Sequence, residues 1–89
     1  MTDREIKEFV RDRDKAVKET IEKQDLDVFK GFYVRYMLKG VYREKLPKDE
    51  ILWLSLYKML FHMTSSTHEE KAIAAEWLYA HGSSPDLKM

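Results

Sequence analysis

The 89-residue sequence contains no cysteine, only three glycines and two prolines, and no net charge, because sixteen basic and sixteen acidic side chains cancel. The absence of cysteine excludes disulfides, thiolate zinc sites, iron–sulfur clusters and cysteine nucleophiles. Few glycines and prolines favour long helices over a turn-rich β fold. A net charge of zero provides no overall attraction toward nucleic acid or an anionic membrane.

Segments that would direct the chain to a membrane are also missing from the sequence. No apolar run approaches the roughly 18 residues that a membrane-spanning helix needs. The first ten residues, MTDREIKEFV, are charged and lack the apolar core of a signal peptide. We therefore expect a cytoplasmic protein without a membrane partner, and the lack of cysteine fits that reducing compartment.

The composition is that of a folded domain, with 44% hydrophobic and 12% aromatic residues. Apolar residues recur at helical spacing, and no run alternates long enough to require a strand. The sequence thus predicts an all-α fold of about four helices in a single domain over residues 1–82, followed by a loosely ordered tail over residues 83–89. The expected helices cover about residues 3–23, 25–39, 47–63 and 67–81.

Short local patterns mark the ends of these helices. Two capping boxes are expected, in which a threonine or serine and a glutamate bond each other's free backbone N–H groups. The candidate pairs are Thr2–Glu5 for the first helix, and Ser66–Glu69 or Thr67–Glu70 for the fourth. Asp25 is suited to cap the second helix, and Gly40 and Gly82 to follow the second and fourth helices in the left-handed conformation.

The third helix is apolar almost all the way round. In the segment 50–63, EILWLSLYKMLFHM, the polar positions fall on one narrow stripe, and Lys48 extends it. A helix of this kind must be surrounded, which predicts a compact protein packed around a central third helix. A second copy of the chain, or another partner, could supply part of the cover.

Gly31 lies inside the second expected helix, where glycine costs about 1 kcal/mol relative to alanine. It would either permit a close approach of another backbone or mark a bend, and the sequence leaves both interpretations open.

Catalytic and metal-binding patterns are not found. His62, His68 and His81 are not spaced by four residues. Nearly all paired carboxylates have a basic residue three or four positions away, and Asp49–Glu50 and Glu69–Glu70 sit at expected helix starts, where negative charge is favourable. No glycine-rich phosphate loop or nucleophile elbow occurs. We expect no enzyme activity, no cofactor and no metal.

A basic segment carries the best nucleic-acid candidate. Its cations are Arg35, Lys39, Arg43, Lys45 and Lys48. Tyr33, Tyr36 and Tyr42 are interleaved with them, and tyrosine rings can stack on exposed bases. A simpler interpretation is that the first two cations complement the C-terminal dipole of the second helix. A nucleic-acid-binding accessory or regulatory protein using residues 33–48 is therefore the alternative hypothesis.

The preferred hypothesis rests on large aromatic side chains in the third and fourth helices. The candidate interface residues are Trp53, Tyr57, Phe61, Trp77 and Tyr79. The apolar stripe of the first helix is narrow, the helices are too short to cover all of this surface, and aromatic residues are enriched at protein interfaces. The sequence thus favours a small helical interaction or adaptor protein that forms a homodimer or binds another protein.

Overall fold

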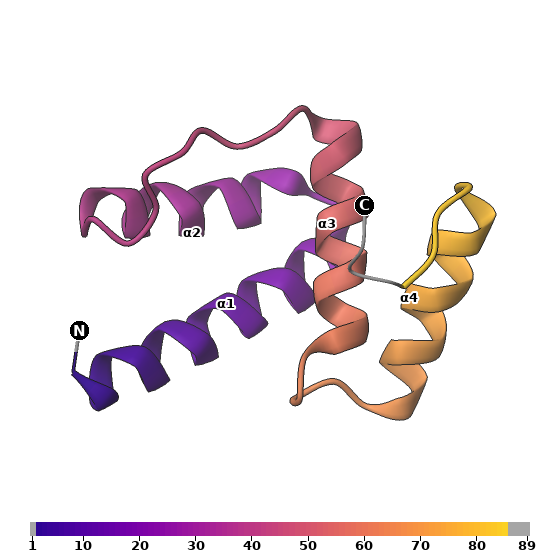
Figure 1. Ribbon diagram of the computed structural model, residues 1–89, viewed down its shortest axis with the longest axis horizontal. Helices are drawn as coiled ribbons and strands as arrows, with labels where there is room; N and C mark the ends of the chain where they lie inside the picture. Colours follow the sequence, from indigo (N-terminus) through magenta and orange to yellow (C-terminus); the bar gives the residue numbers. More distant parts are fainter. Residues whose placement is uncertain (1, 86–89) are drawn as a thin grey trace. The chain divides into compact units, whose positions relative to one another are not determined.

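The computed structural model describes residues 2–85, which contain four α-helices and no strand. The predicted all-α fold is confirmed. The helices are α1 (Asp3–Lys23), α2 (Leu26–Leu38), α3 (Asp49–His62) and α4 (His68–Ala80), coloured in chain order in Figure 1. Each begins and ends within two residues of its predicted bounds.

The contacts of the chain group into two units, Met1–Lys45 with α1 and α2, and Leu46–Met89 with α3 and α4. The single domain over residues 1–82 and the central position of the third helix stay predictions. Of the expected tail over residues 83–89, residues 86–89 lie outside the described part of the chain. Within that tail, the Ser83 backbone N–H donates to the Leu78 carbonyl oxygen at 2.8 Å.

The first unit is a helical hairpin, in which α1 and α2 run in opposite directions against each other (Figure 1). The predicted Thr2–Glu5 capping box is present at the start of α1. Gln24 ends α1 in the left-handed conformation, with a φ of 52°, and Asp25 caps α2 by accepting the Asp27 backbone N–H at 3.0 Å. These two residues are the whole connection, so the chain reverses at once.

Aromatic rings form the core of this hairpin. Phe29, Phe32 and Tyr36 of α2 are at most 5% exposed. Phe9 of α1 lies 6.0 Å from the Phe32 ring and 5.0 Å from the Tyr36 ring, the second contact being edge-on. After α2 the chain folds back, and the Tyr42 ring comes within 5.7 Å of Phe9. Burial of a large apolar side chain contributes about 1.5–3 kcal/mol, so this cluster stabilises the hairpin.

The second unit pairs α3 with α4 through the turn that follows His62 (Figure 1). The Ser66 hydroxyl donates to the Leu60 carbonyl oxygen at 2.6 Å and fixes the turn. Of the two alternatives for the fourth helix, the capping box is Thr67 with Glu70. The Glu70 backbone N–H donates to Thr67 Oγ1 at 3.1 Å, and the Thr67 N–H donates to Glu70 Oε1 at 2.9 Å.

The apolar surface of α3 is only partly covered in the single chain. Leu52, Leu56 and Leu60, each four residues apart, are at most 3% exposed. Ile51, which lies on the polar stripe, is 51% exposed, and Trp53 is half-buried. The helix therefore retains apolar surface that water still reaches.

Candidate interaction surfaces

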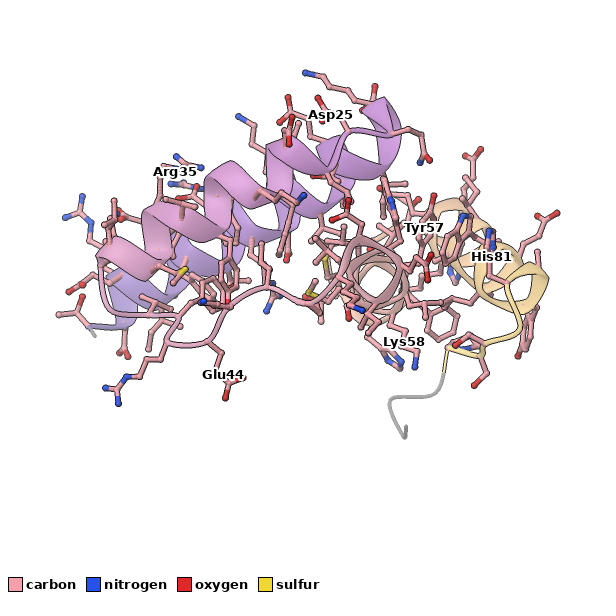
Figure 2. The ribbon with its side chains drawn as sticks, turned by 90° about the horizontal axis from the view of Figure 1, so that it is seen from above. Asp25, Arg35, Glu44, Tyr57, Lys58 and His81 are labelled. Carbon is pink, nitrogen blue, oxygen red and sulfur yellow. The ribbon has the colours of Figure 1, made fainter. Side chains whose placement is uncertain are left out.

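A stack of three rings occupies the second unit. Tyr57 of α3 is 3% exposed, and its ring lies parallel to that of Trp77 in α4, with centroids 4.0 Å apart and planes 6° apart. Trp77 also stacks on His81, with centroids 3.8 Å apart, and His81 Nδ1 lies 2.8 Å from the Trp77 carbonyl oxygen. Tyr57 and His81 mark the two ends of this stack in Figure 2. The stack fixes α4 against α3 and leaves Tyr57 little area for a partner.

His81 is the member of the stack that sequence reasoning missed. From the sequence, His81 is considered only as a possible metal ligand, and its spacing from the other histidines is unsuitable. The available signal was its spacing of four residues from Trp77, which places two side chains on one face of a helix.

The other predicted interface residues keep more of their surface. Trp53 is half-buried, and its ring is tilted relative to that of Tyr57, with centroids 6.2 Å apart. Phe61 is half-buried, and Tyr79 is 65% exposed. These last two side chains border a shallow hollow of about 290 Å³, together with His62, Ser84 and Pro85. The five predicted residues thus divide between the Tyr57–Trp77 stack and three aromatic side chains that keep accessible surface.

Exposed apolar side chains also occur on the outer faces of two helices, as neighbours on α2 and singly on α4. On α2, Val34 is 52% exposed and Leu38 is 85% exposed. On α4, Ile73 is 48% exposed and lies on the same side as the exposed Glu69 and Glu76. Surface apolar groups that share one face, rather than being scattered singly, mark potential interaction sites.

The basic segment is divided between the two units. Arg35, Lys39, Arg43 and Lys45 belong to Met1–Lys45, whereas Lys48 belongs to the second unit. All five are exposed, and none forms an ion pair with a carboxylate among residues 2–85. Arg35 points away from α2, while Glu44 lies on the other side of the hairpin (Figure 2). Lys39 Nζ is 4.9 Å from the centroid of the Tyr36 ring, a cation–π contact.

The tyrosines interleaved with these cations are engaged in internal contacts. The Tyr33 and Tyr42 rings stack on each other, with centroids 4.1 Å apart, and the Tyr33 hydroxyl donates to the Glu44 carbonyl oxygen at 2.5 Å. Tyr36 is 5% exposed, and its hydroxyl donates to Asp12 Oδ2 at 2.7 Å. These rings therefore offer less surface for base stacking than the sequence suggested.

Two of these hydroxyls have a raised pKa. The hydrogen bond to Asp12, helped by burial, raises the pKa of Tyr36 to about 12. Burial raises the pKa of Tyr42, with Arg13 opposing the shift. Both groups stay protonated at neutral pH, so they act as hydrogen-bond donors rather than as bases.

Neither a metal centre nor a membrane span is found in the part of the chain that the structure describes. Among residues 2–85, no group of three or more histidine, aspartate or glutamate side chains could hold a metal ion. No helix in that range is both long and apolar enough to cross a membrane.

Comparison with protein-family models, with curated proteins and with solved structures gives no match for this chain.

Proposed function

We propose that this protein is a small, non-catalytic helical interaction protein that self-associates. The observation that carries the proposal is the apolar area that stays exposed on the outer helix faces after the two helices of each hairpin have packed together. Leu38, Tyr79 and Val34 are each more than half exposed. Covering such surface is favourable by about 25 cal/mol for each Å² removed from water. A cytoplasmic location, expected from the cysteine-free composition, is part of the proposal.

The accessible aromatic side chains of Trp53, Phe61 and Tyr79, which we call the rim, are the candidate contacts for another protein. Exposed aromatic side chains on a rigid support are typical of interface anchors, because little side-chain freedom is lost when a partner binds.

Self-association is tested by the mass in solution, measured by light scattering on a sizing column over a wide concentration range. A mass that rises from one chain to two with concentration supports the proposal. A mass of one chain at every concentration would overturn self-association. Tyr79→Ser then tests the rim: binding to a protein partner should weaken, while the circular dichroism spectrum stays unchanged because this side chain is exposed.

The second candidate is nucleic-acid binding through Arg35, Lys39, Arg43, Lys45 and Lys48. The observation in its favour is that these exposed cations lack carboxylate partners among residues 2–85. Each phosphate contact would lower the logarithm of the binding constant in proportion to the logarithm of the salt concentration. Neutralising Arg43 and Lys45 together should therefore reduce both the affinity and the salt slope in an anisotropy titration. No binding of single- or double-stranded DNA or RNA at low salt would exclude this function.

A further inference from the structure

The outer face of α2 carries an exposed row of four residues, which begins with an acidic residue and a glycine and ends with two apolar side chains. Asp27, Gly31, Val34 and Leu38 are all exposed, and their spacing of four, three and four residues is that of a coiled-coil seam. We call these four residues the α2 seam. A seam that faces water in a single chain is a surface suited to a second helix.

Gly31 has no explanation within its own chain. The α-helix runs without interruption from Leu26 to Leu38. A Cβ atom added at Gly31 would have no heavy atom within 4 Å, so no neighbouring residue of the chain requires glycine there. Glycine nevertheless weakens a helix interior relative to alanine. Its place between Asp27 and Val34 of the seam leaves a notch that a side chain of another helix can fill.

The charges of α2 make this face complementary to itself. Asp27 is exposed in the first turn, and Arg35 is exposed near the last turn, with no ion pair among residues 2–85. When two copies of the helix lie antiparallel, the acidic end of each meets the basic end of the other. A parallel pair would instead bring like charges together.

We propose that the α2 seam binds the α2 seam of a second copy, with the two helices antiparallel about a twofold axis. This assignment rests on the proposed self-association and identifies its surface. With the axis between Gly31 and Val34, each Val34 packs into the notch left by Gly31 of the other copy. Asp27 then lies beside Leu38 of the other copy and one helical turn from its Arg35. By symmetry, every contact occurs twice.

The corresponding row on α4 is unsuitable for the same pairing. Glu69, Ile73, Glu76 and Ala80 are exposed and have the same spacing. An antiparallel pair of these rows would bring four glutamates together without a basic residue from either row, and like charges at an interface are unfavourable. Ile73 therefore provides a matched control position that is also apolar and about half exposed.

One helix face per chain makes a small interface. Stable complexes bury about 1,200–2,000 Å² in total, and weak, transient ones bury less. We therefore expect a concentration-dependent dimer, which sedimentation equilibrium measures directly.

The decisive experiment exchanges the charges. Asp27→Arg and Arg35→Asp should each weaken the homodimer about tenfold, because each substitution acts at two symmetric sites. An equimolar mixture of the two variants should recover dimerisation, since both charge pairs are complementary in the mixed dimer. Native mass spectrometry identifies that mixed species, and circular dichroism of each variant alone checks the fold.

Gly31→Ala separates helix stability from association. Alanine should raise the thermal stability of the chain and at the same time weaken the dimer by filling the notch. Ile73→Lys should leave the dimer constant unchanged. If the wild type dimerises but neither charge variant nor Gly31→Ala changes the constant, the α2 seam is wrong while self-association stands. A wild type that stays monomeric overturns both.

Discussion

Replacing Tyr36 by phenylalanine removes one hydroxyl from the core of the first unit and leaves the ring in place. That hydroxyl donates to Asp12 Oδ2 at 2.7 Å, joining residues 24 positions apart on α2 and α1. The ring is 5% exposed, whereas Asp12 is only half-buried. The substitution therefore tests how much a single polar contact between the two helices stabilises the hairpin.

The expected loss follows from the type of bond. A hydrogen bond to a charged group contributes about 1.5–3 kcal/mol when both groups are buried. Water can reach Asp12 and replace the lost donor, so we expect a loss in the free energy of unfolding at the lower end, about 1–1.5 kcal/mol. For a chain of this size, each 1 kcal/mol lowers the melting temperature by about 4–8 °C. Urea unfolding followed by circular dichroism measures the difference directly.

Tyr33→Phe is the matched control. This substitution also removes a hydroxyl that donates a hydrogen bond, but the acceptor is the uncharged carbonyl oxygen of the exposed Glu44. We expect a loss of less than about 0.5 kcal/mol, because the carbonyl is readily hydrated. Equal losses in the two variants, or no loss in Tyr36→Phe, would refute the assignment of the Tyr36–Asp12 bond as a stabilising contact.

Three further predictions concern pH, a helix cap and a buried hydroxyl. The pKa of Tyr36 rises from 10.0 to about 12 in the folded chain, so the stability that its hydroxyl contributes is complete below about pH 10 and is lost as the pH approaches 12. The urea midpoint of the wild type should therefore fall at alkaline pH, and it should fall less in Tyr36→Phe. Thr67→Ala removes the side-chain cap of α4 and should lower the free energy of unfolding in urea by about 1 kcal/mol. The same change at the exposed Thr64, which caps no helix, should lower it little. Thr20 is fully buried, and its hydroxyl has no hydrogen-bond partner among the described residues, so Thr20→Val should raise the free energy of unfolding by about 1 kcal/mol, and a decrease would contradict the assignment.

Helix ends could be predicted because their signals are local. The Thr2–Glu5 box and the left-handed Gly40, with a φ of 79°, involve residues within one or two turns of the helix end. The fourth helix shows the limit of such reasoning. Two boxes shifted by one residue were compatible with the sequence, and only the geometry of the turn identified Thr67.

The candidate surfaces were less predictable because they depend on contacts between distant residues. Tyr33 and Tyr42 alternate with cations in the sequence, which suggested exposed rings, yet the chain folds back after α2 and stacks the two rings together. Likewise, nothing local indicates that Tyr57 lies under Trp77, twenty positions away along the chain. Sequence periodicity identifies apolar positions but not which of them meet.

The distribution of aromatic residues has a spectroscopic consequence. Both tryptophans, Trp53 and Trp77, belong to Leu46–Met89, whereas the aromatic residues of Met1–Lys45 are phenylalanines and tyrosines. Selective excitation of tryptophan therefore reports on the α3–α4 hairpin alone, while far-ultraviolet circular dichroism reports on all four helices. Coincident urea transitions from the two probes would mean that both hairpins unfold as one cooperative unit. Separate transitions would give each hairpin its own stability, measured on the unmodified chain.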